Sequence, residues 1–167
     1  MCVIIDTCCI PKVFNPKAKE HTRFSLLYAW ISGKNGRLVY GGTKYKKELR
    51  VMTNFLKLFL NYDRKGKVTR LVDSAVDAFA LKAKEKIRAK AFNDEHLVGI
   101  VAISRCGVIC TDDTTAIPFI TRQDLYSSVN LQAPKIYSRR SHEAMYGSGI
   151  GSAPRQQGQR NRKRNGK

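Results

Sequence analysis

Short apolar runs alternate with longer amphipathic segments along most of the chain. Strand-like runs occupy residues 3–5, 36–42, 67–73 and 107–113, and residues 135–138 could add an edge strand. Between these runs, hydrophobic residues recur every three or four positions, a spacing typical of helices that cover a core. Strands that alternate with helices predict an α/β fold with a mainly parallel sheet of four to five strands. The expected architecture is a three-layer α/β/α sandwich.

Helical patterns lie between the expected strands. Residues 22–32 carry hydrophobic side chains at helical spacing, and residues 43–62 predict one long amphipathic helix. Residues 73–92 have lysines at alternate positions, as in a strand, but their alanines and their length favour a helix. Asn93 is expected to cap the next helix. Residues 117–126 predict a short helix before the last strand.

The chain has a large excess of positive charge. Its 167 residues include 31 Lys and Arg against 13 Asp and Glu, which gives a formal net charge of +18. Such an imbalance indicates a polyanionic partner, with nucleic acid favoured over an anionic membrane. No apolar stretch is long enough to span a bilayer or to act as a signal peptide, so we expect a cytoplasmic protein. The five cysteines lie in apolar segments and fit reduced core thiols better than disulfides or a zinc site.

The last part of the chain differs in composition from the rest. Residues 139–167 hold eight Lys and Arg against one acid, and from Gly147 onward they are rich in Gly, Ser, Gln and Asn. With almost no apolar residue to bury, this segment should be disordered on its own. We therefore expect one folded domain over residues 1–138 and a basic tail over residues 139–167. The tail is expected to bind RNA through a group of cations that includes Arg160, Arg162, Lys163 and Arg164. A solubilising tail, or one ordered by a partner protein, is the alternative.

Acidic residues stand at the ends of strands and at the starts of helices. Asp6 ends the first strand, Asp112 and Asp113 end the fourth, Glu48 lies early in a helix, and Asp94 opens another. Since ligands of parallel sheets bind outside the carboxyl ends of the strands, these acids should converge at one edge. These acids also have structural alternatives: Asp6 and Asp112 as turn formers, Glu48 as the ion-pair partner of Lys44, and Asp94 as a first-turn acid favoured by the helix dipole. Converging carboxylates resist ionisation unless a cation neutralises them, and oxygen ligands suit Mg²⁺ or Mn²⁺.

The order of these residues resembles that of PIN-domain nucleases. Four motifs in the family's order cover about residues 2–126: a strand ending in Asp-Thr, a Glu early in a helix, an Asn-Asp-x-His helix start and a strand ending in Thr-x-Asp. They are formed here by Asp6 and Thr7, by Glu48, by Asn93, Asp94 and His96, and by Thr111, Asp112 and Asp113. The resemblance implies an α/β/α sandwich that cleaves RNA with the help of bound metal ions.

The resemblance also implies roles for the individual acids. Asp6, Asp94 and Asp113 match metal ligands, and Glu48 matches a fourth acid that either binds the metal or orients the attacking water. Asp112 stands where the family often has a neutral polar residue. Either of the two neighbouring aspartates could therefore be the ligand, and Asp112 could also help to bind a second metal.

Three further residues are expected to support the acids. Thr7 and Thr111 match hydroxyl positions of the family. A histidine could act as a general acid beside a phosphate, but one in the first turn of a helix more often makes a local hydrogen bond. We therefore expect His96 to steady a neighbouring acid.

Two functions from different classes follow from these observations. The first is a Mg²⁺- or Mn²⁺-dependent endoribonuclease that cleaves single-stranded RNA, as a toxin or defence nuclease. Such a protein could be held inactive by an acidic inhibitor, an antitoxin, and the family resemblance also implies a homodimer. The second is an RNA-binding or ribosome-associated protein whose acids are not catalytic. Because all four acid positions of the family are filled, the nuclease is favoured.

Overall fold

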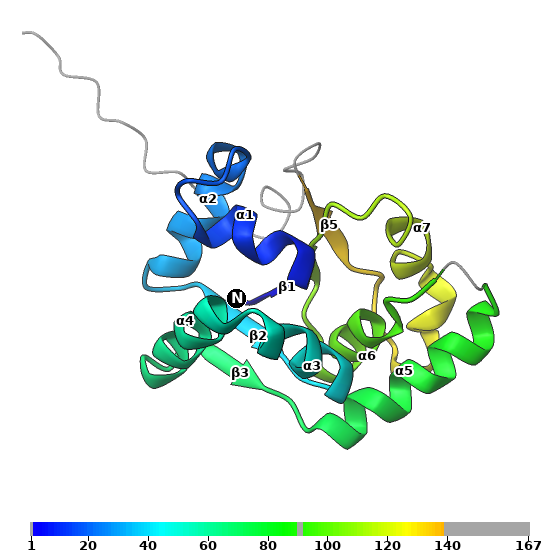
Figure 1. Ribbon diagram of the computed structural model, residues 1–167. Coiled ribbons are helices and arrows are strands. Elements are labelled where there is room, and N and C mark those ends of the chain that lie inside the picture. The colour runs from blue at the N-terminus through cyan, green and yellow to red at the C-terminus, as the bar shows by residue number, and fades with distance from the viewer. Residues whose placement is uncertain (1, 90–91, 139–167) are drawn as a thin grey trace, which may run out of the picture.

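The computed structural model describes residues 2–89 and 92–138 (Figure 1). Its five strands form one parallel sheet in the order β3-β2-β1-β4-β5. The strands are β1 (Cys2–Ile5), β2 (Arg37–Tyr40), β3 (Val68–Arg70), β4 (Val108–Cys110) and β5 (Lys135–Tyr137). Each strand overlaps one of the apolar runs, so the predicted α/β fold and parallel sheet are confirmed. The expected tail, with Arg160, Arg162, Lys163 and Arg164, lies outside the described residues.

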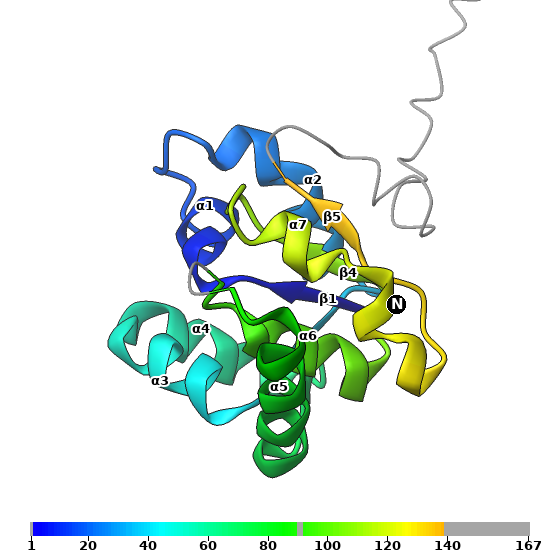
Figure 2. The ribbon, with the colours of Figure 1, turned by 90° about the vertical axis from the view of Figure 1, so that its right-hand side faces the viewer.

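Helices connect the strands and cover both faces of the sheet. The α-helices are α1 (Ile10–Phe14), α2 (His21–Ser32), α3 (Thr43–Val51), α4 (Thr53–Arg64), α5 (Asp73–Ile87), α6 (Glu95–Ser104) and α7 (Ile117–Ile120). Three 3-10 turns are η1 (Thr7–Cys9), η2 (Gln123–Leu125) and η3 (Ser127–Val129). Figure 2 shows α1 and α2 on one side of β1 and α5 and α6 on the other. Right-handed crossovers of a parallel sheet produce this three-layer arrangement.

The central strand β1 is apolar because helices cover both of its faces. Val3, Ile4 and Ile5 of β1 are at most 1% exposed, as expected for a central strand that pairs on both sides. Aromatic rings then join the helices of one layer: Phe14 of α1 lies 6.2 Å from the ring of Tyr28 in α2 and 6.2 Å from a ring in α4. The core is therefore continuous from the sheet into the helices.

Gly99 determines how closely α6 approaches α5. A Cβ atom at this position would lie 2.5 Å from the carbonyl oxygen of Val76, which is far inside van der Waals contact. A larger residue would push the two helices apart. The glycine thus fixes the position of α6, including the residues at its N-terminal end.

The long helix predicted over residues 43–62 is wrong, because the chain breaks it at Met52. Met52 has φ −99° and ψ 62°, outside the helical region, and separates α3 from α4. The β-branched residues Val51 and Thr53 flank the break, and such residues have a reduced helix propensity. Two shorter helices replace the predicted one.

Two other local features differ from expectation. Asp94, not Asn93, is the N-cap residue of α6, and the side chain of Asn93 instead accepts a hydrogen bond from Lys44 at 2.8 Å. The short segment η1 and α1 after β1 was not predicted. Pro11 lies in the first turn of α1, a position where a helix tolerates proline.

The strand order places the topological switch point between β1 and β4. From β1 the chain moves outward through β2 to β3, and then returns to add β4 and β5 on the other side. The crevice outside the carboxyl ends of such neighbouring strands is the usual ligand site of an open α/β sheet. Asp6 directly follows β1, and Thr111 directly follows β4.

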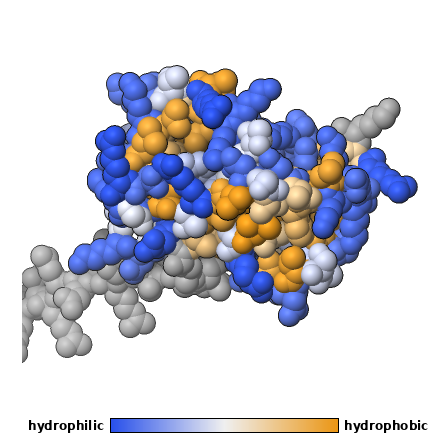
Figure 3. Space-filling view, turned by 90° about the horizontal axis from the view of Figure 1, so that it is seen from below, coloured by the Kyte–Doolittle hydropathy of each residue, from blue (hydrophilic) through white to orange (hydrophobic). Residues whose placement is uncertain are grey.

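The surface is largely hydrophilic, with apolar patches. Figure 3 shows one face on which hydrophobic residues gather among many hydrophilic ones. Leu81 of α5 is 58% exposed, and Val72, just before α5, is 69% exposed. In the part of the chain that the structure describes, no helix is long and apolar enough to cross a membrane.

Candidate active site

Asp6 links the ends of the two central strands. Its side chain is buried, with the residue only 5% exposed, and its backbone N–H donates to the carbonyl oxygen of Cys110 at 2.9 Å. Its Oδ2 accepts a hydrogen bond from the hydroxyl of Thr111 at 2.6 Å, and its Oδ1 caps η1 by accepting from the N–H of Cys8 at 3.3 Å. The capping role and a place in the candidate site therefore occur in the same residue.

The hydroxyl of Thr111 also holds the loop after β4. Its Oγ1 accepts a hydrogen bond from the backbone N–H of Asp113 at 3.1 Å while donating to Asp6. Thr111 is fully buried. One hydroxyl group thus fixes the carboxylate after β1 relative to the loop after β4.

Glu48 reaches the same region from α3. The hydroxyl of Thr7 donates to Oε2 of Glu48 at 2.7 Å, which joins η1 to α3. About a third of the Glu48 side chain is exposed. Thr7 and Thr111 therefore each donate a hydrogen bond to one acid of the predicted set.

Two aspartates of α5 hold the N-terminal end of α3. The backbone N–H of Gly42 donates to Asp73 at 2.9 Å, and the N–H of Thr43 donates to Asp77 at the same distance. Helix N-termini have unpaired N–H groups that carboxylates satisfy well. Gly42 has φ +84°, a conformation that favours glycine. These contacts orient α3 and so position Glu48.

His96 lies beside Glu48 without a hydrogen bond to it. Its Nε2 is 3.8 Å from Oε2 of Glu48, too far for such a bond, and within residues 2–89 and 92–138 neither ring nitrogen has a hydrogen-bond partner. Burial, reinforced by the charge of Lys44, lowers the pKa of His96 to about 3. The imidazole is therefore neutral near pH 7. The local hydrogen bond expected from the sequence is not formed.

The pKa of Asp94 is influenced by the other predicted acids. Its pKa is raised to about 6, first by burial and then by the charges of Asp6, Asp113 and Glu48, while the charge of Lys44 opposes the rise. Carboxylates interact in this way when they are close together in a partly desolvated site. The four acids come from separate parts of the sequence, and the fold brings them within electrostatic reach of one another.

The two neighbouring aspartates after β4 have different partners. Oδ2 of Asp112 accepts a hydrogen bond from Lys12 Nζ at 2.9 Å. Oδ1 of Asp113 accepts from the backbone N–H groups of Thr115 and Ala116, at 2.8 and 3.1 Å. Asp113 is among the charges that raise the pKa of Asp94. Asp113 therefore belongs electrostatically with the converging acids, whereas Asp112 forms an ion pair with a lysine.

Two lysines lie near the acids, and of these the sequence analysis considered only Lys44, as a possible ion-pair partner of Glu48. Nζ of Lys12 lies 2.9 Å from Asp112 and 3.3 Å from Glu20. Burial lowers the pKa of Lys12, but the hydrogen bonds to these two carboxylates raise it above its ordinary value. Lys12 belongs to α1, and no spacing in the sequence indicated it. Lys44 lies one turn before Glu48, but it contacts Asn93 and Glu95 instead, which contradicts the alternative that Glu48 only pairs with Lys44.

The acids are engaged separately rather than around one point. Among the residues that the structure describes, no group of three or more His, Cys, Asp and Glu side chains is placed to hold a metal ion. Asp6 is bound by Thr111, Asp113 by backbone N–H groups and Asp112 by Lys12. The available donors are nevertheless carboxylate oxygens, which fit Mg²⁺ or Mn²⁺ in chemistry.

No family model matches the chain, and no curated protein matches it. The resemblance to PIN-domain nucleases therefore rests on the motifs, their order and the α/β topology.

Proposed function

We propose that the protein is a Mg²⁺- or Mn²⁺-dependent endoribonuclease that cleaves single-stranded RNA. The observation that carries this proposal is the hydroxyl of Thr111, which binds Asp6 after β1 and the N–H of Asp113 after β4 and so holds two of the predicted acids at one edge of the sheet. The charges of Asp6, Asp113 and Glu48 also help burial to raise the pKa of Asp94. Asp6 and Asp113 follow β1 and β4, the two strands that flank the switch point of the parallel sheet, where such folds bind ligands. Mutually repelling carboxylates favour the binding of a cation. The net charge of +18 supports a polyanionic substrate.

In this proposal, Asp6, Asp94 and Asp113 would hold the ion. When bound, a divalent cation lowers the pKa of a coordinated water and stabilises charge that develops on the phosphate. Thr111 keeps the carboxylate of Asp6 in one orientation. Thr7 binds Oε2 of Glu48, and Oε1 of Glu48 makes no hydrogen bond to any residue that the structure describes. Oε1 can therefore orient the attacking water or accept its proton.

A binding-only function has one observation in its favour. The described acids are engaged by hydrogen bonds and by an ion pair, and not around a common point. In that case the protein would bind RNA, alone or on the ribosome, and the acids would only stabilise the fold. The two functions differ in whether the chain cleaves RNA with divalent cations.

The biological setting is a further part of the proposal. A toxin or defence nuclease of this kind would be held inactive by an acidic inhibitor protein, whose carboxylates would complement the basic surface. A homodimer is also proposed, from the family resemblance alone.

The decisive experiment is cleavage of an end-labelled single-stranded RNA by the purified full chain. We expect internal cuts with Mg²⁺ or Mn²⁺ and intact RNA in EDTA. Replacing Asp6, Asp94 or Asp113 with Asn keeps the size of the side chain but removes the charge that holds the ion. The rate should fall at least about a hundredfold, since a catalytic metal contributes several kcal/mol at the transition state.

One control variant and one variant that distinguishes the two neighbouring aspartates accompany this experiment. Asp124 pairs with Arg122 on the surface, so Asp124→Asn should cleave like the unmodified chain. Asp112→Asn should have a small effect if Asp113 is the ligand, and a large effect if Asp112 also binds the metal. Cleavage that survives in EDTA, or an Asp94→Asn protein as active as the unmodified chain, would leave the binding-only function.

A further inference from the structure

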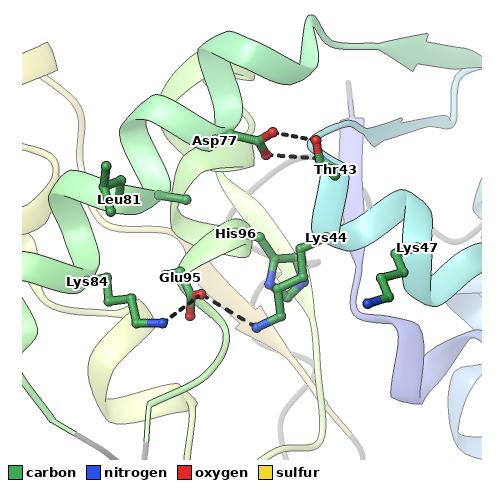
Figure 4. A pocket seen from close by; sticks show the side chains of 9 residues that line it. Thr43, Lys44, Lys47, Asp77, Leu81, Lys84, Glu95 and His96 are labelled. Carbon is green, nitrogen blue, oxygen red and sulfur yellow. Dashed lines mark hydrogen bonds and ion pairs between the residues drawn. The ribbon is translucent and has the colours of Figure 1, made fainter.

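A pocket of about 440 Å³ lies between α3, α5 and α6 (Figure 4). Lys44 and Lys47 of α3, Leu81 and Lys84 of α5, and His96 of α6 are among the residues that line it. Apart from His96, a supporting residue, none of these side chains belongs to the set predicted for the active site. The predicted active site therefore does not account for this pocket.

The pocket lies next to the candidate active site. His96 forms part of its wall, and Nε2 of the same ring is 3.8 Å from Oε2 of Glu48. Lys47, on another part of the wall, directly precedes Glu48 in the chain. The imidazole ring of His96 therefore lies between the pocket and Glu48.

The charged groups of the pocket leave positive charge available to a ligand. Oε1 of Glu95 lies 3.7 Å from Nζ of both Lys44 and Lys84, so one negative charge is shared by two ammonium groups. Figure 4 shows Lys44 and Lys84 meeting at Glu95, with Lys47 beyond Lys44. Lys47 is exposed, and it forms no ion pair or side-chain hydrogen bond with any residue in the described ranges. Asp77, the other acid of the wall, is engaged by the N–H and the hydroxyl of Thr43, at 2.9 and 2.5 Å.

The rest of the wall combines an apolar side with unpaired polar atoms. Ala80 and Leu81 supply apolar surface, and Leu81 is 58% exposed. Oε2 of Glu95 and both ring nitrogens of His96 are buried, without a hydrogen-bond partner in the described part of the chain. Buried polar atoms without partners are costly and rare. Since Glu95 and His96 both line the pocket, a ligand that draws these side chains toward it would satisfy such atoms.

We propose that this pocket binds a nucleotide of single-stranded RNA that adjoins the scissile phosphate. The phosphate would contact Lys47 and Lys84, and one face of the base would pack on Leu81. The polar edge of the base or the ribose hydroxyl would hydrogen-bond with His96 and Glu95. A nucleotide combines an anion, a flat apolar face and polar edges, which are the three features of the wall. The position beside the scissile bond rests on the proposed nuclease function.

Binding of a short RNA in EDTA tests the pocket without cleavage. The probe is a fluorescently labelled single-stranded RNA of ten nucleotides, titrated with the full chain at several salt concentrations. The double variant Lys47→Ala and Lys84→Ala should bind more weakly. The slope of log affinity against log salt should fall by about 0.7, the change expected when one phosphate of a single strand is no longer neutralised.

A matched double variant separates the pocket from the general basic charge. Lys57 and Lys65 are exposed lysines in and after α4, outside the pocket lining. Changing both to Ala removes the same charge, and we expect a slope close to that of the unmodified chain. If the two double variants lose the same slope, the pocket does not bind a nucleotide.

A second pair of variants places a negative charge in the pocket. Leu81→Glu should weaken RNA binding roughly three- to tenfold, because a carboxylate near the phosphate repels it. Leu60→Glu puts the same charge on α4, where Leu60 is 40% exposed, and should have little effect. Equal weakening by both variants would overturn the inference, and thermal melting checks that both remain folded.

Cleavage by the unmodified chain separates this inference from the proposed function. If RNA binding depends on Lys47 and Lys84 but no cleavage occurs with Mg²⁺ or Mn²⁺, the nuclease function is wrong and the pocket remains an RNA-binding site. If the chain cleaves RNA while both pocket variants match their controls in affinity and in KM, the nuclease function stands and the pocket inference is wrong.

Discussion

Asp6 and His96 are both buried beside the candidate active site, but their surroundings differ. We define the strand-end region as Asp6 with Thr111, and the helix-start region as Asp94 with His96. In the strand-end region, both oxygens of the Asp6 carboxylate accept hydrogen bonds, from Thr111 and from the backbone of Cys8. In the helix-start region, His96 has no hydrogen-bond partner among the described residues, and the pKa of Asp94 is raised by burial and by like charges.

This difference shows that the polar groups of the strand-end region are hydrogen-bonded within the protein, whereas those of the helix-start region are left for a ligand. The strand-end region satisfies its own polar groups and so contributes to the stability of the fold. The helix-start region carries charge repulsion and unpaired nitrogens, which cost free energy until a ligand compensates for them. A bound ligand is therefore expected to stabilise mainly the helix-start region, while the strand-end region supplies Asp6 in a fixed orientation.

The largest effect on stability is expected in the strand-end region. Thr111→Val keeps the shape of the side chain but removes the hydroxyl that donates to Asp6. The buried carboxylate loses a hydrogen bond without gaining water, so unfolding free energy should fall by about 1–3 kcal/mol. Urea unfolding at pH 7 measures the change.

Thr7→Val is the matched comparison for this variant. It removes the hydroxyl that donates to Glu48, but about a third of the Glu48 side chain is exposed, so water can replace the bond. The expected change is within roughly 0.5 kcal/mol. Equal losses from the two variants would contradict the distinction between a buried, hydrogen-bonded Asp6 and a partly solvated Glu48.

A smaller, pH-dependent effect is expected in the helix-start region. His96 has a pKa of about 3 in the folded protein against 6.5 ordinarily, so below pH 6.5 the unfolded chain takes up a proton that the folded chain does not. Stability is therefore lost as the pH falls. The variant His96→Leu lacks this loss, and its stability relative to the unmodified chain should rise by about 0.7 kcal/mol between pH 7 and pH 6.

Asp94 titrates in the opposite sense over the same range. Its pKa is raised to about 6, so the folded chain takes up a proton there and gains stability as the pH falls. This gain occurs in both proteins and cancels from their difference. Unfolding free energies from urea titrations at the two pH values give the comparison. A difference that does not change with pH would mean that His96 is not held neutral by burial.

The sequence predicted the ends of β1 and β4 well because their signals are local, whereas a supporting role for Thr111 was expected only from the family resemblance. A run of buried apolar residues ends at Asp6, another ends just before Thr111, and parallel strands bring their carboxyl ends to one edge. The same rule predicted that Asp113 would lie near Asp6. No tertiary information was needed beyond the order of strands and helices.

The remaining features depend on packing that the sequence does not encode locally. The break at Met52 changes the direction of the chain inside a continuous helical pattern. Lys12 reaches Asp112 from a short helix that has no clear periodic signal. The position of His96 depends on the close approach of α6 to α5 at Gly99. Whether His96 can form a hydrogen bond with Glu48 depends on the distance between α6 and α3.

The most direct test of the central claim is Mn²⁺ binding to the full chain, followed by its thermal unfolding. If Asp6, Asp94, Asp113 and Glu48 converge on a divalent cation, saturating Mn²⁺ should stabilise the unmodified chain, by about 2.7 kcal/mol at a hundred times the Kd. Asp94→Asn should unfold at a higher temperature than the unmodified chain without metal, because it lacks the repulsion, and Mn²⁺ should shift it little. Asp124→Asn should respond to Mn²⁺ like the unmodified chain. An unmodified chain whose midpoint does not move with Mn²⁺, or an equal shift in Asp94→Asn, would contradict the account.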